Sequence, residues 1–328
     1  MLEGVSESRA RAGCSVLSLL AVSLNVSILD AVAEEPLRLA ELRRRIGSPP
    51  QTTLRGYLRK LTEIGVLEKS REEAFPGSVN YDLGSTGREL LKVTDALRLW
   101  LGERPGQPLA LGEDATRSAI CALAEGWRTR IVRALAARPL SLTELDELIS
   151  GISYPSLERR LAEMRDAGLE EAARERGGRG TPYAPTDWLR RAVGPITVAA
   201  QWEQRYLRQE AMPVTNRDAE AAFLLAVPLV RLPPQTTGSC SLAIEVRSGS
   251  GISMAGAVAH VEQGEVVSCV SRLGGQLDAW VTGSSATWLS ALTEPETGQL
   301  DLGGDRRLAR ELVDGLHTVL FRTRVPAL

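Results

Sequence analysis

The side chains of this 328-residue sequence that could perform catalysis or bind a metal are scattered. Its cysteines and histidines lie far apart, at Cys14, Cys121, Cys240, Cys269, His260 and His317. No C-x-x-C, no H-E-x-x-H and no cluster of carboxylates accompanies them. Metal sites and activated nucleophiles need such groups at close spacing. The sequence therefore predicts no catalytic residue, no metal and no cofactor, and we expect the cysteines to be buried, reduced thiols.

Arginines, in contrast, gather at two places, each in a helix that is followed by a turn-rich segment. Guanidinium groups there could neutralise DNA phosphates, and neighbouring polar side chains could reach base edges. The candidate DNA contacts are Gln51, Thr52, Thr53, Arg55, Arg59, Tyr154, Ser156, Arg159, Arg160, Arg174, Arg176 and Arg179. A single arginine is more simply a solvated helix residue. It is the grouping on helix and turn that favours nucleic acid.

The elements that would position these side chains occur twice. Residues 139–169 align without a gap on residues 36–66, at an offset of 103. The aligned pairs include Leu39 with Leu142, Leu54 with Leu157, and Gly65 with Gly168. Each copy is typical of a helix, a short helix, a turn, a third helix and a hairpin. A period this long indicates a whole domain with its own core.

Local signals in the second copy place its helices. Ser141 and Glu144 have the spacing of a capping box at a helix start. Ser153 is an N-cap candidate with Pro155 in the following first turn, and Gly168 ends that helix. A long helix is predicted over residues 188–209, with a break near Gly194-Pro195.

Pro139 to Leu145 (PLSLTEL), Ile152 to Leu169 (ISYPSLERRLAEMRDAGL), a basic tip and Tyr183 to Thr186 together resemble the HxlR-type winged helix-turn-helix domains of bacterial transcription factors, which are similar to the MarR group. The resemblance covers about residues 15–105 and 115–210. It implies binding of double-stranded DNA by a homodimer, with the third helix in the major groove and the wing over the backbone. One chain could then act as a pseudo-dimer, the second copy replacing the partner subunit, or form a homodimer.

The last third reads as a different domain. Strands are predicted at residues 241–247, 252–260, 265–273, 277–281 and 299–302, and helices at residues 285–292 and 306–321. The strand, Thr282-Gly283-Ser284, the helix with W-L-x-x-L, and G-x-L-x-L-x-G-D at residues 298–305 resemble the sterol-carrier-type lipid-binding fold. The resemblance implies a pocket for a hydrophobic small molecule, with candidate lining residues Trp280, Trp288, Leu292, Leu308, Leu312 and Leu316. Taken singly, each of these is more simply a core residue.

The predicted fold class is mainly α with α+β content. Two tandem winged helix-turn-helix domains, residues 1–105 and 106–212, precede a small α/β sterol-carrier-like domain, residues 213–328. Arg9, Arg11 and the apolar run at residues 13–26 imitate a signal peptide, but residues 28–33 recur as 131–136, so we expect this run to belong to the first domain. No uninterrupted apolar run is long enough to span a membrane, and a cytoplasmic location is expected.

Charge leaves alternatives open. Residues 1–105 hold 15 basic and 14 acidic residues, and residues 106–210 hold 15 of each, whereas a DNA-binding domain is often strongly basic. The predicted function is a DNA-binding transcriptional regulator that responds to a hydrophobic small molecule, without enzymatic activity. The alternatives are a small-molecule binding or sequestering protein whose winged helices no longer bind DNA, and a protein-interaction adaptor.

Overall fold

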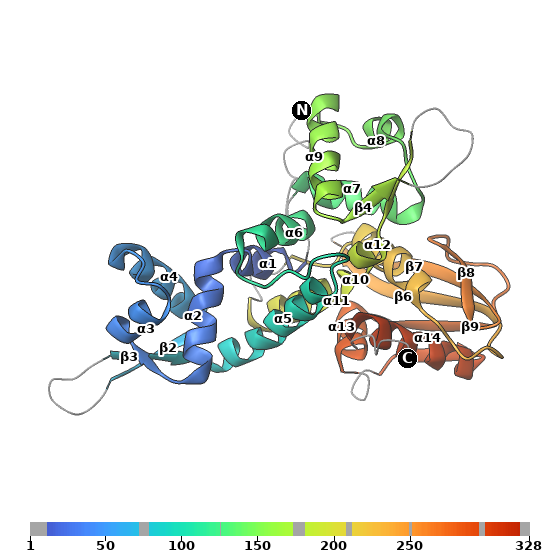
Figure 1. The fold of residues 1–328 in the computed structure, drawn as a ribbon. Helices are drawn as coiled ribbons and strands as arrows, with labels where there is room; N and C mark the ends of the chain where they lie inside the picture. The colour runs from blue at the N-terminus through green and yellow to red at the C-terminus, as the bar shows by residue number, and fades with distance from the viewer. Residues whose placement is uncertain are drawn as a thin grey trace.

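A computed structural model describes residues 12–71, 79–124, 126–172, 181–207, 212–248, 251–294 and 299–321. Helices with short hairpins build the chain up to residue 206, and a five-stranded sheet with its helices builds the remainder (Figure 1). The predicted mixture of α structure with a smaller β content is confirmed. Within the described ranges no single helix has the length and apolar composition of a membrane span; α1 and α2 reach them only together, across an 83° bend.

The first module is a winged helix-turn-helix, as predicted. Its elements are α1 (Cys14–Leu20), α2 (Ser23–Glu34), β1 (Leu37–Arg38), α3 (Leu39–Arg45), α4 (Gln51–Glu63), β2 (Leu67–Arg71), β3 (Val79–Leu83) and α5 (Ser85–Gly102). The three strands form an antiparallel sheet in the order β1-β3-β2. Leu54, Leu58 and Leu61 recur along α4 at helical spacing and are buried, which fixes this helix against the core.

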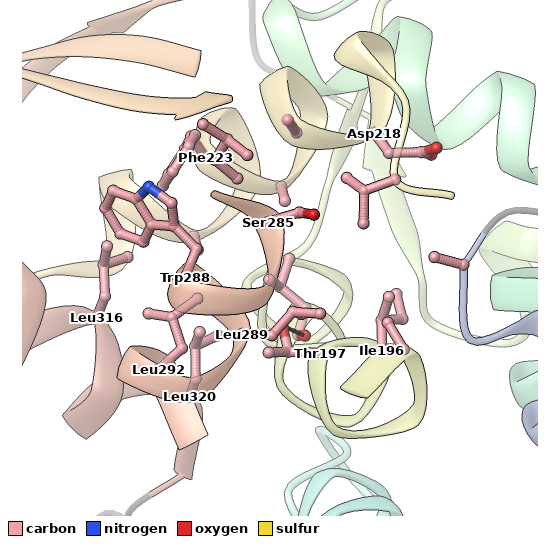
Figure 2. A pocket seen from close by; sticks show the side chains of 18 residues that line it. Ile196, Thr197, Asp218, Phe223, Ser285, Trp288, Leu289, Leu292, Leu316 and Leu320 are labelled. Atoms are coloured by element: carbon pink, nitrogen blue, oxygen red, sulfur yellow. Dashed lines mark hydrogen bonds between the residues drawn. The ribbon is translucent and has the colours of Figure 1, made fainter. Parts of the chain in front are cut away.

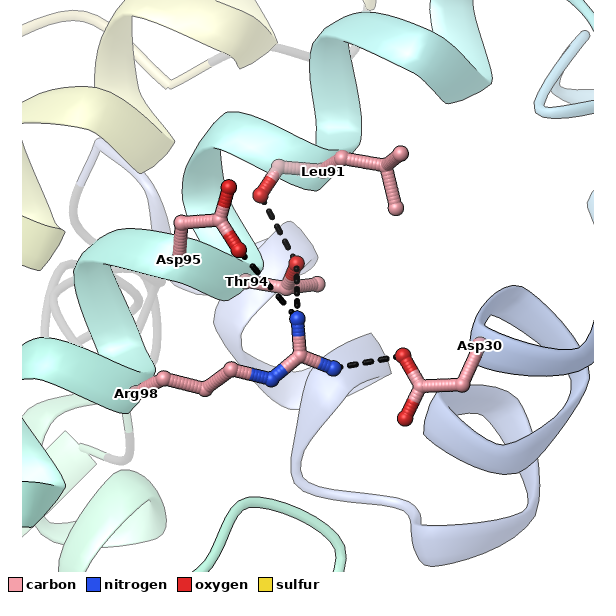
Figure 3. Close-up of polar contacts among 5 residues, drawn as sticks. All are labelled: Asp30, Leu91, Thr94, Asp95 and Arg98. Atoms are coloured by element: carbon pink, nitrogen blue, oxygen red, sulfur yellow. Dashed lines mark hydrogen bonds and ion pairs between the residues drawn. The ribbon is translucent and has the colours of Figure 1, made fainter. Parts of the chain in front are cut away.

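A polar network also joins α2 to the long helix α5 (Figure 3). Arg98 on α5 bonds the carboxylate of Asp30 on α2 at 2.5 Å, and contacts Thr94 at 3.3 Å and Asp95 at 3.2 Å. The side chains of Arg98 and Asp30 are 40% and 48% exposed, so solvent screens their attraction to about 1 kcal/mol or less. Burial of apolar side chains therefore decides how α5 packs on α2.

A second set of elements follows, which we call the second module. Its order is similar to that of the first, but in place of β1 it has only an isolated bridge between Leu140 and Tyr183, and in place of α5 it has two helices. It comprises α6 (Asp114–Ala124), α7 (Gly126–Ala137), α8 (Leu142–Leu148), α9 (Tyr154–Asp166), β4 (Glu170–Ala172), β5 (Tyr183–Pro185), α10 (Asp187–Arg191) and α11 (Val193–Tyr206). The predicted capping box is present: Ser141 Oγ accepts the backbone N–H of Glu144 at 3.3 Å, and the Glu144 carboxylate accepts that of Ser141 at 2.8 Å. These bonds, with help from Arg138, lower the pKa of Glu144 to about 2.

Two details of this region differ from the sequence prediction. Ser153 is the N-cap residue of α9, but its hydroxyl bonds Ser156 Oγ at 3.0 Å and accepts no backbone N–H. The expected helix break near Gly194-Pro195 lies earlier, at Ala192 between α10 and α11. Pro195 falls within the first turn of α11, where a missing N–H leaves no hydrogen bond unmade, so the proline does not interrupt the helix.

The C-terminal region is built around a sheet in the order β10-β9-β6-β7-β8, in which only β6 and β9 run parallel among the described strands. Its elements are α12 (Asn216–Ala226), η2 (Val227–Leu229), β6 (Gly238–Ser248), β7 (Gly251–Glu262), β8 (Glu265–Val270), β9 (Ala279–Ser284), α13 (Ser285–Thr293), β10 (Asp301–Gly304) and α14 (Arg306–Phe321). Leu242, Ala257 and Val281 form one buried row across β6, β7 and β9. Helices α12 and α14 pack on β7 and β9, respectively.

The predicted strands and helices of this region are confirmed, with shifted ends. Strand β8 ends at Val270 rather than residue 273, and β9 includes Thr282 to Ser284. Helix α12 was not predicted. The signal was present, because Thr215 and Asp218 form a capping box before an apolar run.

Glu203 of α11 anchors the start of α1. It is 1% exposed, and its carboxylate accepts the backbone N–H groups of Gly13 at 2.7 Å and Val16 at 2.9 Å. Burial raises the pKa of Glu203 because desolvation outweighs these bonds. A carboxylate at these donors holds an otherwise marginal seven-residue helix in place.

We expect Glu203→Gln to lower the free energy of unfolding by about 1–3 kcal/mol, because the amide nitrogen cannot accept from a backbone N–H and leaves a buried donor unsatisfied. Urea unfolding monitored by circular dichroism measures this loss. The matched control is Glu147→Gln on the exposed face of α8, which should change stability by less than about 0.5 kcal/mol. Equal effects of the two substitutions would show that the α1 anchor contributes nothing.

Candidate nucleic-acid interface

Helix α4 presents the predicted DNA contacts on its free face. Gln51, Thr52, Thr53, Arg55 and Arg59 are all exposed, whereas the leucines between them are buried. Arg59 lies 3.8 Å from Glu63, a loose pairing on the surface. A helix held in the core on one side and carrying amide, hydroxyl and guanidinium groups on the other has the chemistry for major-groove contact.

The arginines that end α3 differ in their availability to phosphate. Arg45 pairs with Glu34, the last residue of α2, and with Glu35, its C-cap residue. Arg43 Nε donates to the Pro49 carbonyl at 2.9 Å. Arg44 is exposed, and no described residue bonds its side chain. Of these three, Arg44 is therefore the one that can turn to a phosphate without breaking another bond.

Helix α9 has the same design with a different surface. Its apolar side, Leu157, Leu161 and Met164, is buried. Tyr154 and Arg159 are exposed, with Arg159 at 4.0 Å from Glu163, while Ser156 is half-buried.

Two residues make the α9 surface less favourable to DNA than that of α4. Arg160 is half-buried, and its Nε is buried without a hydrogen-bond partner among the described residues. The exposed Glu158 places a negative charge where the repeat has Arg55 in α4.

The predicted wing contacts Arg174, Arg176 and Arg179 lie outside the described residues. The strands flanking them, β4 and β5, pair from Glu170 with Pro185 to Ala172 with Tyr183. The basic wing stays a prediction.

Three buried tryptophans join α5 to α10 and α11. The rings of Trp100 and Trp188 stack with centroids 4.6 Å apart and planes 7° from parallel. Each indole N–H donates to the backbone carbonyl of the other residue, at 2.8 and 2.7 Å. Trp202 Nε1 donates to the carbonyl of Thr86 at 3.1 Å. Beside them, Arg191 and Glu103 form an ion pair of 2.8 Å.

In the predicted repeat, these contacts exchange equivalent positions of the two copies. After the hairpins the offset is 102, as Tyr183 and Tyr81 show (183 minus 81). At this offset Trp202 corresponds to Trp100, and Trp188 corresponds to Thr86. The indole N–H of Trp100, in the first copy, donates to the carbonyl of residue 188 in the second copy. The indole N–H of Trp202, in the second copy, donates to the carbonyl of residue 86 in the first copy. The same hydrogen bond is thus made once in each direction. Such exchange is the pattern of an interface with twofold symmetry.

A cavity of about 80 Å³ lies among α11, α12, α13 and α14 (Figure 2). Trp288, Leu292 and Leu316, three of the predicted ligand residues, line it. Leu308 and Leu312 do not, because they are buried in the core beside it. The remaining lining comes largely from α11 and α12, including Ile196, Thr197, Ala219, Ala222 and Phe223, none of which was predicted.

The predicted ligand residue Trp280 does not line this cavity. Its side chain is 44% exposed and lies across Gly303 of β10, where an added Cβ would come within 2.2 Å of the ring. Side chains alternate along a strand. Because Ala279 and Val281 face the helices, Trp280 faces the opposite side of the sheet.

The cysteines, histidines and carboxylates form no metal site among the parts of the chain that the structure describes. No group of three or more His, Cys, Asp or Glu residues there could hold a metal ion. None of the four cysteines is in a disulfide. Burial raises the pKa of Cys240 and that of Cys269 to about 12, so both are thiols at neutral pH.

Comparison with known proteins gives a match in the first module. The HxlR-like helix-turn-helix family matches residues 21–107. BH0655 of Halalkalibacterium halodurans, an uncharacterized HTH-type transcriptional regulator, is 31% identical over 85 residues, which are 26% of this chain and 75% of that protein.

Two solved structures are also similar over 26% of the chain. One is a protein of Enterococcus faecalis V583 described as a MarR-family transcriptional regulator, with 24% identity, 78% of its chain covered and a TM-score of 0.25. The other is diamide-treated YodB of B. subtilis, with 27% identity, 85% covered and a TM-score of 0.25. At these TM-scores neither similarity carries an argument about the fold.

Proposed function

This chain belongs to the HxlR-like helix-turn-helix family, and on that premise we propose that it is a cytoplasmic DNA-binding transcriptional regulator. The partner is double-stranded DNA, with α4 in the major groove. We further propose that residues 106–212 are a second winged helix-turn-helix, so that one chain supplies two DNA-contacting helices. No catalytic role is proposed.

The observation that carries the pseudo-dimer is the reciprocal tryptophan contact. Trp100 and Trp202 occupy equivalent positions and bond equivalent carbonyls of the opposite module. Random packing of two domains has no reason to exchange residues in this way, whereas a twofold-symmetric dimer does so at every contact. The contact supports two modules related as the subunits of a dimer, in a single chain.

For the C-terminal region we propose a sterol-carrier-like domain that makes the regulator responsive to a hydrophobic small molecule. The apolar cavity supports this role. A second candidate is a small-molecule binding protein whose modules have lost DNA binding. Glu158 and the half-buried Arg160 on α9 favour it for the second module.

Arg55→Ala and Arg159→Ala test the DNA surface. Loss of one phosphate or base contact should weaken binding by about 1–3 kcal/mol and reduce the salt slope by about 1, with folding unchanged. The matched control is Arg310→Ala on the exposed side of α14. Anisotropy titrations across salt concentrations measure both quantities, on DNA selected from a random pool.

The outcomes separate the candidates. Selection of two half-sites about 34 Å apart, with both substitutions harmful, is the result expected of a tandem reader. An effect of Arg55→Ala alone would restrict DNA binding to the first module. No enriched sequence, and no effect of either substitution, would overturn the proposal in favour of the small-molecule binding protein.

A further inference from the structure

We propose that the cavity among α11, α12, α13 and α14 is the effector site, that it takes a small uncharged apolar molecule, and that occupancy reaches the second module through α12. This inference rests on the proposed ligand-responsive regulator and names its ligand class and its route. The site does not lie within the predicted C-terminal domain alone, because α11 of the second module forms one wall.

The chemistry of the lining sets the ligand class. The walls are alanine, valine, isoleucine, leucine, phenylalanine and tryptophan side chains. Two of the polar groups there bond within the protein: Thr197 Oγ1 donates to the Val193 carbonyl at 2.7 Å, and Trp288 Nε1 donates to the Ala243 carbonyl at 2.8 Å. A charged ligand would lose its hydration without a counter-ion in return.

Asp218 supplies the carboxylate of the lining, and both of its oxygens already accept hydrogen bonds from the protein. One oxygen accepts from Arg133 of α7, with Nε at 3.1 Å, and the other accepts from the Thr215 hydroxyl at 2.7 Å. In Figure 2 this carboxylate points away from Trp288. The hydroxyl of Ser285 also lines the cavity and bonds no described residue, so it can serve a single polar group of the ligand.

The size of the cavity limits the ligand and couples binding to movement. Its volume of about 80 Å³ is below the roughly 150 Å³ of an engineered apolar cavity that holds benzene. We therefore expect even one ring to push the surrounding helices apart, and a sterol or long acyl chain would extend beyond this volume. A ligand that binds only the widened arrangement shifts the protein toward it.

Helix α12 carries such a movement to the second module, because arginines of that module hold both its ends. Arg133 of α7 bonds Asp218 in its first turn, and Arg190 of α10 donates to the Leu224 carbonyl in its last turn at 3.1 Å. The stripe Ala219, Ala222 and Phe223 between these ends faces the cavity.

The first module lacks this connection. Its residue equivalent to Arg133 is Asp30 (133 minus 103), which bonds Arg98 of its own module (Figure 3). The second module is therefore the one that responds to the cavity through this position.

Benzene is the first probe, applied near saturation to the full chain without DNA. We expect the melting temperature of the wild type to rise by about 2 °C or more. Ala222→Met, which fills the cavity, should abolish the rise, whereas Ala286→Met on the exposed side of α13 should leave it intact. No shift in the wild type, or an equal shift in Ala222→Met, would overturn the site. If Ala222→Met does not fold, Ala219→Val replaces it.

Hydrogen exchange tests the route. Benzene should change amide exchange in α12 and α7 of the wild type, but in α12 alone of Arg133→Met. Unchanged exchange in α7 of the wild type would overturn the transmission. Neither experiment uses DNA, so the two proposals can fail separately. Benzene binding without DNA binding would contradict the proposed regulator function and would still support the effector site. DNA binding without any effect of benzene would support the regulator function and contradict the effector site.

Discussion

Replacing Trp100 by alanine is expected to lower the free energy of unfolding by about 3–5 kcal/mol, among the largest single-residue effects in this chain. The side chain is buried, so its removal leaves a cavity between the modules. It also removes the stack on Trp188 and the bond to the Trp188 carbonyl, which then lacks its donor.

The same substitution should loosen the placement of the two modules. We expect binding to DNA with two half-sites to fall at least tenfold, while binding to a single half-site stays near the wild-type value, since α4 is untouched. Urea unfolding and anisotropy titrations on both DNAs measure the two effects. A double-mutant cycle with Trp188→Ala isolates the pairwise term.

Trp280→Ala is the control, because Trp280 is half-exposed on the outer face of the sheet. This substitution should lower the free energy of unfolding by about 1 kcal/mol or less. If Trp100→Ala and Trp280→Ala proved equally mild, the modules would not be packed on each other in solution. If Trp100→Ala destabilised the chain and weakened binding to both DNAs alike, the interface would hold the fold without setting the spacing of the two helices.

Local signals in the sequence were enough to predict single helices and strands. Ser141 and Glu144 predicted the start of α8. The helical spacing of the leucines in α4 and α9 is a second signal of this kind, and the structure buries these leucines. Both signals act within one or two helical turns, so they do not depend on the rest of the chain. The alternation of Ala279, Trp280 and Val281 was equally local, and would have placed Trp280 outside.

Contacts between distant segments had no such signal. The bond between Trp100 and Trp188 joins residues 88 apart, and its equivalence to the Trp202 bond depends on the shortened second hairpin. The cavity needs α11 and α13 side by side, and periodicity places a residue on a face without saying what covers that face. Trp288, Leu292 and Leu316 were found only because they face the interior of their own domain.

The burial of Glu170 was likewise not predictable from local sequence signals. It is also the basis of the second prediction with a large effect on stability. At the offset of 103 it corresponds to Leu67, which is 1% exposed at the start of β2. Glu170 is 2% exposed at the start of β4, and neither carboxylate oxygen has a hydrogen-bond partner among the described residues. The second module thus buries a carboxyl group where the first buries a leucine.

Burial raises the pKa of Glu170 from 4.5 to about 8, because desolvation exceeds the attraction of Arg165. Above pH 4.5 the unfolded chain releases this proton while the folded chain keeps it, so stability falls as the pH rises and levels off above about 8. At about 1.4 kcal/mol for each pH unit, the free energy of unfolding at pH 8 is lower than at pH 4.5 by on the order of 5 kcal/mol.

We therefore expect Glu170→Leu to stabilise the second module, by little at pH 5 and by several kcal/mol at pH 8, since leucine supplies the apolar contact and has no proton to lose. Thermal unfolding followed by circular dichroism at pH 5, 6, 7 and 8 measures the difference. Glu171→Leu, one residue along on the exposed side of β4, is the matched control and should show no such growth with pH. A gain from Glu170→Leu that stayed constant across the series would mean that the carboxyl ionises in the folded protein much as it does in water. A rigidly buried side chain gives no such result, so water would have to reach Glu170 beneath the wing strand.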